Sequence, residues 1–354
     1  MSKPLRIAFV SVVPSPYQRD LFAALAARPE LDLRVMYMEK SAPDSPWPEK
    51  PLAEYESHLP GFWFSLGHAR VHVNWRLPRA DDFDLVVCNT LMSLTAQWLM
   101  RVRLRRARWM FWGEKPGPRS ARHDILAAPL KRAAGIAAIG TWAEREYAAR
   151  FPGVPVFNIP YHCALAPFLD AQHASVAEVT TYLFCGQMIA RKGLDPLLAA
   201  FARLPGNPRL LLVGREAELP AMLAALPENV RARVRYAGFQ APDALPQFFA
   251  QADVFVLPSR YDGWGVVVNQ ALGAGLPILV SDQVGAGHDL VQAGRNGYTF
   301  AAGNVTDLAE KMRPFIHDSA LASQLGAHSR TLAAEWTPER GAEKWMRALQ
   351  AVLP

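Results

Sequence analysis

LPSRYDGWGVVVNQALGAGLPILVSD, residues 257–282, places an acidic side chain and an amide on either side of a glycine-rich turn. The apolar run 253–259 predicts a buried strand that leads into the turn, and a helix is expected to start near Trp264. Asp262 then lies in the turn and Gln270 on the helix, about 10 Å apart at a rise of about 1.5 Å per residue. A strand, a glycine turn and a helix in this order indicate a parallel α/β sheet, which binds ligands at the carboxyl ends of its strands.

The same alternation of strands and helices extends over the whole chain of 354 residues, a length that suits two domains. The proline-containing segment 157–168 is the predicted junction, so we expect one Rossmann-like domain over 1–165 and a second over 166–336. A last helix, 337–354, is predicted from Thr337 as N-cap and Pro338 at the first helical position. Buried strands are expected at 7–13, 31–38, 83–89, 108–113, 135–140, 181–186, 208–214, 253–259 and 276–282.

Composition and charge narrow the class of protein. No apolar run approaches the roughly 20 residues that span a bilayer, and the amino terminus lacks a signal-peptide pattern. Three widely spaced cysteines fit a reducing, cytoplasmic location. Residues 1–165 hold 22 Lys and Arg against 15 Asp and Glu, a net +7, while the remainder holds 16 against 17, a net −1. This bias suits an anionic partner or is a solubilising excess, and nucleic acid is the least expected partner because no recognised module is present.

The segment from residue 41 to residue 80 is rich in prolines and aromatic residues and is predicted to be a long functional loop. Its tryptophans Trp47, Trp63 and Trp75 suit sugar rings. Just beyond it, Arg101, Arg105 and Arg108 have the spacing of one helix face. Together these residues suggest peripheral docking at the inner face of an anionic membrane, while core packing and a helix-dipole role for the arginines are the alternatives.

The stretch 257–282 resembles the E-x7-E signature of retaining glycosyltransferases of family 4, which have the GT-B fold. FCGQMIARKGLDPLLAAF, residues 184–201, is similar to the family's Gly…Lys-Gly segment, and SDQVGAGHDLVQAGRNGYTF, residues 281–300, to its Gly-rich stretch with an acidic residue, here Asp289. The resemblance implies two Rossmann-like domains facing across a cleft, with the last helix returning to the first domain. It implies a donor-binding second domain and an acceptor-binding first domain.

The resemblance assigns roles to individual residues. The catalytic candidates are Glu114, Arg191, Lys192 and Asp262: the basic pair holds the diphosphate, Asp262 contacts the donor sugar, and Glu114 orients or deprotonates the acceptor or bonds the sugar. The donor-binding set adds Gly186, Phe239, Gly263, Trp264, Gly265 and Gln270. The acceptor or cleft set is Tyr17, Arg19, Glu114 and Lys115.

The expected role of the basic pair, Arg191 and Lys192, also follows from the chemistry of the reaction without the resemblance. Cleavage of a sugar from a nucleoside diphosphate leaves extra negative charge on the distal phosphate, and Arg191, Lys192 and the helix start near Gly265 would stabilise it without a metal. We therefore expect neither a metal nor another cofactor. The acidic run Asp81–Asp84 is not read as a metal site, because it precedes its strand instead of following it.

Two departures from the family pattern leave alternatives open. Gln270 stands where the family has its second acidic residue, and an amide loses the charge-assisted strength of the bond to ribose. The histidine that many members place near Glu114 is absent. The expected activity is transfer of a sugar to the hydroxyl of a glycan or lipid-linked acceptor, in bacterial surface polysaccharide or lipid-linked glycan assembly. A non-catalytic sugar-nucleotide-binding subunit is the alternative, and a nonhydrolysing epimerase is a weaker one. His162, in the junction, is expected to be a packing residue.

Overall fold

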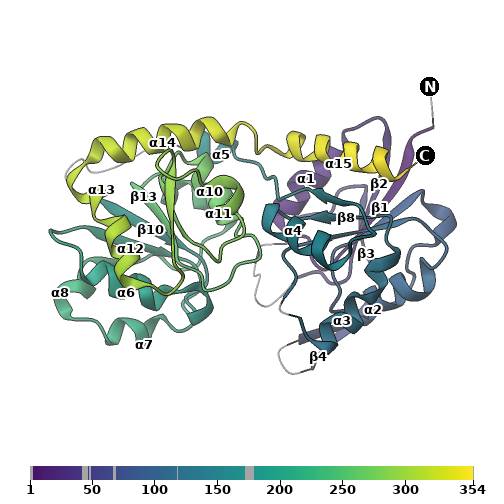
Figure 1. Cartoon of the computed structure of the whole chain (residues 1–354), viewed down its shortest axis with the longest axis horizontal. Helices are drawn as coiled ribbons and strands as arrows, with labels where there is room; N and C mark the ends of the chain where they lie inside the picture. Colours follow the sequence, from purple (N-terminus) through teal and green to yellow (C-terminus); the bar gives the residue numbers. More distant parts are fainter. Residues whose placement is uncertain are drawn as a thin grey trace. The chain divides into compact units, whose positions relative to one another are not determined.

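The computed structural model describes residues 3–41, 47, 49–66, 69–117, 119–171 and 179–353. The chain divides into two compact units (Figure 1): Met1–Cys163 with Pro338–Pro354, and Ala164–Thr337. Each unit is built on a parallel sheet against which helices pack, so the predicted α/β class is confirmed.

The first unit has the strand order β3-β2-β1-β6-β7-β8-β9, and each neighbouring pair is parallel. The interior strand β1 is an apolar run that is buried from Ile7 onward. The order reverses between β1 and β6, which is where open α/β sheets bind ligands. The strands are β1 Leu5–Ser11, β2 Leu31–Tyr37, β3 Glu56–His58, β6 Leu85–Cys88, β7 Trp109–Gly113, β8 Gly135–Ala138 and β9 Val156–Asn158, and the helices are α1 Pro16–Ala26, α2 Leu94–Trp98, α3 Ala121–Ala127, α4 Thr141–Arg150 and α15 Pro338–Val352.

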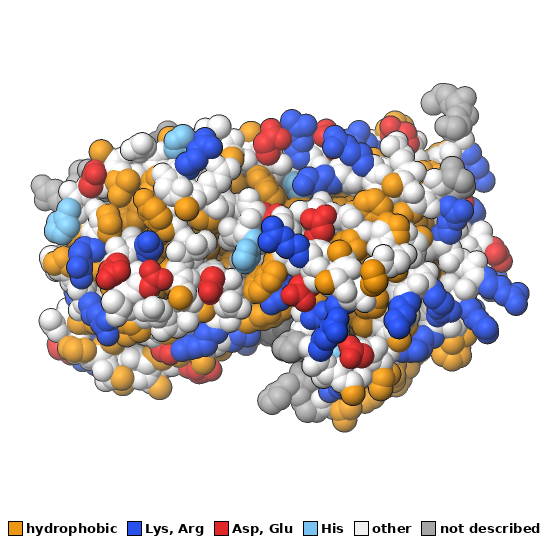
Figure 2. Space-filling view, viewed as in Figure 1, with side chains coloured by type: hydrophobic (Ala, Val, Ile, Leu, Met, Phe, Trp, Pro, Cys, Tyr) orange, Lys and Arg blue, Asp and Glu red, His pale blue; other side chains and the backbone are white. Residues whose placement is uncertain are grey.

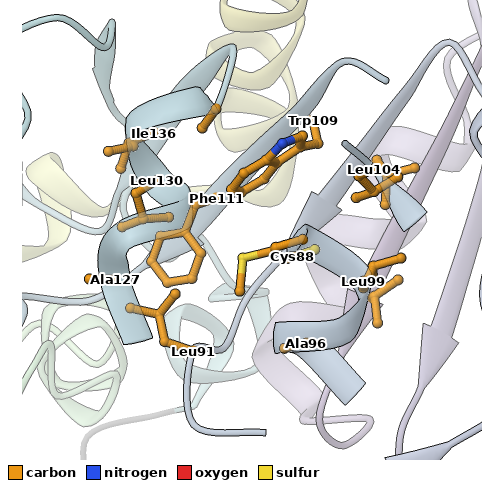
Figure 3. Close-up of a cluster of buried hydrophobic side chains, with 14 of the residues drawn as sticks. Cys88, Leu91, Ala96, Leu99, Leu104, Trp109, Phe111, Ala127, Leu130 and Ile136 are labelled. Atoms are coloured by element: carbon orange, nitrogen blue, oxygen red, sulfur yellow. The ribbon is translucent and has the colours of Figure 1, made fainter. Parts of the chain in front are cut away.

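One face of this sheet carries a core of buried apolar side chains (Figure 3). Trp109 and Phe111 of β7 and Cys88 of β6 pack there against Ala96 of α2 and Leu99 of the π-helical turn Leu99–Arg103. Burial of these side chains fixes α2 on the sheet by its inner face, since roughly 1.5–3 kcal/mol is gained for each large apolar side chain removed from water. The other face of α2 is left for solvent or for a partner.

The last helix, α15, belongs to the first unit, where it packs against α1 (Figure 1). It begins at Pro338, as predicted. Trp345 is fully buried, and its ring lies 5.0 Å from that of Phe9 and 5.5 Å from that of Trp112 between centroids. A side chain from the far end of the chain therefore completes the core beside β1 and β7.

The described part of the segment 41–80 contains more regular structure than the sequence indicated. It contains β3 and an antiparallel hairpin of β4 Gly61–Leu66 and β5 Ala69–Asn74. The predicted basic helix face is also wrong: the helix ends at Arg103, so Arg105 and Arg108 lie beyond it, and Arg108 donates to the carbonyl of Val352, 2.7 Å away. Leu99 and Leu104 pack into the core. These nonpolar contacts direct the chain toward β7 before another helical turn can form.

The second unit repeats the architecture with the strand order β12-β11-β10-β13-β14-β15, again parallel throughout. Its order reverses between β10 and β13. The strands are β10 Thr181–Cys185, β11 Arg209–Val213, β12 Val234–Tyr236, β13 Val254–Leu257, β14 Ile278–Ser281 and β15 Gly297–Phe300, and the helices are α5 Ala166–Asp170, α6 Leu194–Ala202, α7 Leu219–Ala224, α8 Glu228–Arg231, α9 Leu245–Phe249, α10 Val267–Gly273, α11 Gly287–Leu290, α12 Val305–Met312, α13 Pro314–His317 and α14 Ser319–Ala333.

None of the helices in the described part of the chain combines the length and the apolar character needed to cross a bilayer.

Candidate functional site

The predicted donor residues gather at the carboxyl edge of the second sheet, beside the reversal between β10 and β13. Lys192 follows β10 and Asp262 follows β13, and the Nζ atom of Lys192 lies 2.5 Å from Oδ2 of Asp262. Both side chains are largely buried, with 16% and 12% of their surface exposed. Two residues 70 positions apart thus form one ion pair at the place where a ligand of this sheet type binds.

The loop that carries Asp262 is held rigidly. Asp262 accepts a hydrogen bond from the hydroxyl of Ser259 at 3.3 Å. Its backbone N–H donates to the carbonyl of Gln283, and its carbonyl accepts from the N–H of Gly285, both at 3.0 Å. These bonds tie the loop after β13 to the loop after β14 and fix the direction of the carboxylate. Ser259, fully buried, is a site residue that the sequence reasoning missed, although it lies only two residues after the end of β13.

Gly193 sets the position of Lys192. The chain makes a 3-10 turn over Ala190–Lys192 and then enters the left-handed region at Gly193, with φ of +70°. A Cβ atom at this position would lie 1.9 Å from the carbonyl oxygen of Pro258, which is well inside contact distance. Only glycine allows the turn after β10 to approach the end of β13 so closely, and that approach brings Lys192 to Asp262.

The second basic residue, Arg191, is exposed and lies on the same turn. Its guanidinium donates to the carbonyl of Tyr261 at 2.9 Å, and its own carbonyl accepts from the N–H of Arg260 at 2.8 Å. Arg260 also forms a two-bond ion pair with Asp195, at 2.7 and 2.6 Å, which holds the pKa of Asp195 below its ordinary value. The turn after β10 and the loop after β13 are thus clamped together by both backbone and side chains.

The structure shows two features of the glycine turn that the sequence did not indicate. The helix α10 begins at Val267 instead of near Trp264, because Gly265 adopts φ of +90° and delays it. Trp264 is fully buried, and its Nε1 atom donates to Oδ1 of Asn269 at 2.9 Å. Trp264 therefore packs beneath the turn and does not present its ring to a ligand.

The remaining donor candidates lie along the same sheet edge. Gln270 is half-buried on α10, and Gly263 and Gly265 lie in the turn before it. Gly186 follows β10, and a Cβ atom on Gly214 would lie 1.9 Å from the carbonyl oxygen of Gly186. The ends of β10 and β11 therefore come together without side chains between them. Phe239, after β12, is exposed over 42% of its surface.

The acceptor candidates belong to the first unit. Tyr17 follows β1, and its ring lies 4.8 Å from that of Tyr161 between centroids. Burial, and after it the charge of Glu114, raises the pKa of the Tyr161 hydroxyl, so Glu114 lies close to this pair. Glu114 is exposed, and its carbonyl accepts from the hydroxyl of Tyr147 at 2.9 Å. The structure thus brings Tyr17 and Glu114 to the edge of the sheet near the reversal between β1 and β6.

Lys115 contacts an aromatic ring of the first unit. Its Nζ atom lies 3.4 Å from the ring centroid of Trp142, as in a cation–π contact, and burial lowers the pKa of the ammonium group. Nothing in the local sequence indicates this contact, because Trp142 lies on α4 and the two residues are far apart in the chain.

Arg19 is engaged within the first unit. Its guanidinium donates two hydrogen bonds to Glu56, at 2.9 and 2.6 Å, and Glu56 also accepts from the hydroxyl of Tyr37 at 2.6 Å. Arg19, a member of the expected acceptor or cleft set, is thus held in a structural ion pair between α1 and β3. Sequence reasoning could not find this partner, because Glu56 lies in the segment that is predicted to be a loop.

This ion pair makes stability depend on pH. Burial alone would raise the pKa of Glu56, but the hydrogen bonds from Arg19, Tyr37 and the N–H of Ala53 outweigh it and hold the pKa below its ordinary value. Because the folded pKa is depressed, the stabilisation is present above about pH 4.5 and is lost as the pH falls through the folded pKa. We expect Glu56→Gln to lower the free energy of unfolding by about 2 kcal/mol at neutral pH and by much less in acid.

Urea unfolding followed by tryptophan fluorescence at neutral and acidic pH measures this difference. Glu228→Gln is the matched control: its ion pair with Arg231 is exposed, so a loss below about 0.5 kcal/mol is expected. Equal losses in the two variants, or a Glu56→Gln loss that does not change with pH, would contradict the assignment.

His162 packs in the interior, as predicted. It is buried, its Nδ1 atom lies 2.9 Å from the carbonyl oxygen of Pro160, and burial lowers the pKa of the ring to about 4. A Cβ atom on Gly341 of α15 would lie 2.8 Å from that of His162. The glycine therefore lets α15 lie flat on the segment that ends the first unit.

The acidic run 81–84 is used locally. Asp84 accepts hydrogen bonds from the N–H and the guanidinium of Arg6, both at 2.8 Å, which hold the pKa of its carboxyl below the ordinary value. Among the described residues, no group of three or more His, Cys, Asp or Glu side chains is arranged to hold a metal ion.

Comparison with known proteins places this geometry in context. A family model described as "Glycosyl transferases group 1" matches residues 167–332. The lipopolysaccharide core biosynthesis glycosyltransferase LpsE of Rhizobium meliloti is 28% identical over 174 residues, which cover 49% of this chain and 50% of that protein. Sulfoquinovosyl transferase SQD2 of Arabidopsis thaliana is 29% identical over 159 residues, 43% of this chain and 30% of that protein. The chain thus spans half or less of the length of these relatives.

Solved structures match over nearly the whole chain. Sucrose-phosphate synthase from Thermosynechococcus elongatus superposes with a TM-score of 0.75 at 21% identity, covering 98% of each chain. Anabaena Alr3699/HepE in complex with UDP superposes with a TM-score of 0.74 at 16% identity, covering 98% of this chain and 100% of that one. At such identities the likeness shows the fold, which is the predicted GT-B fold.

Proposed function

We propose that the chain is a glycosyltransferase of the glycosyl transferases group 1 family, whose model matches residues 167–332, and that it moves a sugar from a nucleoside-diphosphate sugar to an acceptor hydroxyl. The second unit would bind the donor and the first unit the acceptor. The ion pair of Lys192 and Asp262 at the carboxyl edge of the second sheet is the observation that carries the proposal. The buried cation would stabilise the departing phosphate, and the fixed carboxylate would bind the sugar. The pair thus acts on both sides of the bond that breaks.

The two members of the pair have different tasks in this proposal. Lys192, together with Arg191, stabilises the charge that develops on the distal phosphate as the bond to the sugar breaks. Asp262, held by Ser259 and the loop after β14, accepts a hydrogen bond from a sugar hydroxyl. When the donor binds, the phosphate oxygens share the ammonium group of Lys192, which also leaves the carboxylate ready for the hydroxyl.

The remaining residues extend this arrangement. Gln270, half-buried on α10, donates or accepts a hydrogen bond with the ribose. Gly186, Gly263 and Gly265 leave the backbone open to the diphosphate, and Phe239 offers an exposed ring to the donor. We propose that transfer proceeds with retention and without a metal. The departing phosphate takes the proton of the acceptor hydroxyl, so Glu114 needs only to orient the acceptor or bond the sugar.

The substrates are proposed from the relatives. HepE is solved with UDP and with UDP-glucose, and a mannosyltransferase of Mycobacterium tuberculosis is named as GDP-mannose-dependent. LpsE acts in lipopolysaccharide core biosynthesis. We accordingly propose a nucleotide-sugar donor and a glycan or lipid-linked acceptor, in the assembly of a bacterial surface polysaccharide or a lipid-linked glycan.

Two measurements with one set of compounds test the proposal. The protein is screened with UDP-, GDP-, ADP- and dTDP-sugars for a rise in melting temperature, and the compound that binds is then assayed for release of the nucleoside diphosphate, with and without EDTA. We expect one nucleotide to stabilise the protein and its diphosphate to be released at a rate that EDTA does not change. Binding without any release would instead indicate a non-catalytic subunit. Conversion of the sugar without release would indicate an epimerase, and inhibition by EDTA would overturn the metal-free chemistry.

A further inference from the structure

The first unit carries an apolar surface that the proposed transfer reaction does not use. It consists of Phe62, Phe64 and Leu66 on β4, and Leu94, Trp98 and Val102 on α2 and the turn after it, which we name the docking face. Each of these side chains is between 43% and 65% exposed. Contiguous exposed apolar side chains of this size are rare on monomeric soluble proteins and mark interaction sites.

The two rows of side chains lie on either side of one groove. Phe62 pairs across the hairpin with Val73, so both lie on the same side of its two strands. Val73 lines a groove of about 510 Å³ together with Leu94, Trp98 and Val102. Residues 94, 98 and 102 are four apart and share one helical face. The hairpin thus forms one wall of the groove, and the helix forms the other.

The other side of the hairpin anchors it. Arg70 lies over the ring of Trp63, 4.4 Å from its centroid, and donates to Glu39 at 2.9 Å. At the base of the hairpin, the hydroxyl of Thr95 donates to the carbonyl of His72 at 3.0 Å. An isolated two-stranded hairpin is only marginally stable in water, and these bonds tie this one to the segment just after β2 and to α2. The docking face is therefore formed before any partner arrives.

Charge indicates which partner fits. The segment from Leu94 to Phe111 contains five arginines and no acidic residue. Arg103, Arg105 and Arg106 are exposed, and within the described residues none of them forms an ion pair. Figure 2 shows basic side chains gathered over this part of the unit, near the position of α2, and hydrophobic side chains along its lower edge near β4. An apolar face bordered by unpaired arginines is complementary to a surface with an apolar interior and anionic headgroups.

We propose that the docking face seats the first unit on an anionic lipid bilayer, with the aromatic side chains in the interface and the arginines against the headgroups. Phe and Trp side chains are suited to this depth. A second copy of the chain fits less well, because a two-fold interface places the same patch against itself and would bring the arginines of both copies together. The proposal concerns binding alone and does not depend on the proposed transfer reaction.

Vesicle flotation of the full chain tests the proposal without any sugar nucleotide. We expect the protein to float with vesicles of phosphatidylcholine and phosphatidylglycerol, and not with phosphatidylcholine alone. The variant Arg103→Gln/Arg105→Gln/Arg106→Gln should bind on the order of a hundredfold more weakly, since each arginine near an anionic surface contributes roughly fivefold. Its matched control neutralises three exposed arginines of the second unit, Arg209→Gln/Arg231→Gln/Arg235→Gln, and should float like the wild type.

A second pair of variants tests the apolar part. Phe64→Asp and Trp98→Asp should each weaken flotation by about tenfold or more, whereas Phe239→Asp, which removes an exposed ring from the second unit, should not. The substituted side chains are exposed, so the circular dichroism spectra should match that of the wild type. Equal binding to neutral vesicles, or wild-type flotation of the triple arginine variant, would overturn the proposal. So would a wild-type dimer that Phe64→Asp converts to a monomer in sedimentation velocity, because it would identify a second copy as the occupant.

Discussion

Lys192→Ala is expected to lower turnover by about a thousandfold, the largest effect of any single substitution on activity. Under the proposed function, Lys192 faces the distal phosphate as negative charge develops on it. A unit charge at about 4 Å contributes roughly 4 kcal/mol at an intermediate effective dielectric, and about 1.4 kcal/mol corresponds to a tenfold change in rate. Because this charge is greater in the transition state than in the bound donor, kcat should fall far more than KM rises.

The variant also leaves Asp262 without its cation, so a structural effect has to be separated from a catalytic one. The double variant Lys192→Ala/Asp262→Asn removes the unpaired charge and should recover most of the stability lost in the single variant. It should not recover turnover. Lys311→Ala, on α12 of the same unit, is the control and should retain wild-type kinetics. If kcat in Lys192→Ala stayed near that of the wild type, Lys192 would not be the group that stabilises the departing phosphate.

Gly193→Ala is expected to cause a large loss of stability in the second unit, about 3 kcal/mol or more. The residue has φ of +70°, which costs an L-residue about 1–2 kcal/mol. The added Cβ atom would also meet the carbonyl oxygen of Pro258 at 1.9 Å, and that oxygen belongs to the backbone and has no rotamer to change. The turn after β10 must then move away from the end of β13, and Lys192 moves with it.

Gly294→Ala separates these two costs. Gly294 has φ of +74°, but a Cβ atom there would meet nothing within 4 Å. Its loss should therefore be about 1 kcal/mol, from the backbone conformation alone. Urea unfolding measures both variants in the same unit. Similar losses at the two glycines would mean that close approach to Pro258 is not what requires glycine at residue 193.

The strands of both sheets could be predicted because each is a short apolar run with turn residues at its ends. Runs such as 7–13 and 253–259 can only be buried on both faces, and that burial implies parallel strands under helices. Since parallel sheets bind ligands where their strands end, the same runs also locate the ligand edge. This reasoning locates Lys192 and Asp262 at that edge, because each lies in the loop after a strand, whereas the roles expected of them came mainly from the resemblance to a known family.

Contacts between distant segments could not be predicted in the same way. The partner of Arg19 is Glu56, and nothing in either local sequence indicates that α1 and β3 meet there. Trp264 is in the donor-binding set that the resemblance implies, and nothing in the local sequence indicates that its ring is fully buried. Local sequence indicates the position of a residue along an element, whereas its partner depends on how the elements pack.

The hairpin of β4 and β5 could have been found. FWFSL, residues 62–66, is rich in aromatic residues, and ARVHV, residues 69–73, alternates apolar and polar residues. The two runs are separated by Gly67 and His68, a spacing typical of a tight hairpin. The prolines on either side favoured a loop instead. These two loop residues lie outside the described part of the chain, and the pairing of the flanking strands is what establishes the hairpin.

The placement of α15 in the first unit has a consequence for the order of events during biosynthesis. The hydrophobic interior around Phe9 and Trp112 is incomplete until Trp345 packs into it. Trp345 leaves the ribosome only after all of residues 164–337 have been translated. The second unit can therefore mature as an insertion while the amino-terminal half is still incomplete, with apolar surface near β1 open to chaperones. The unit that contains the amino terminus is therefore the first to be synthesised and the last to complete its folding.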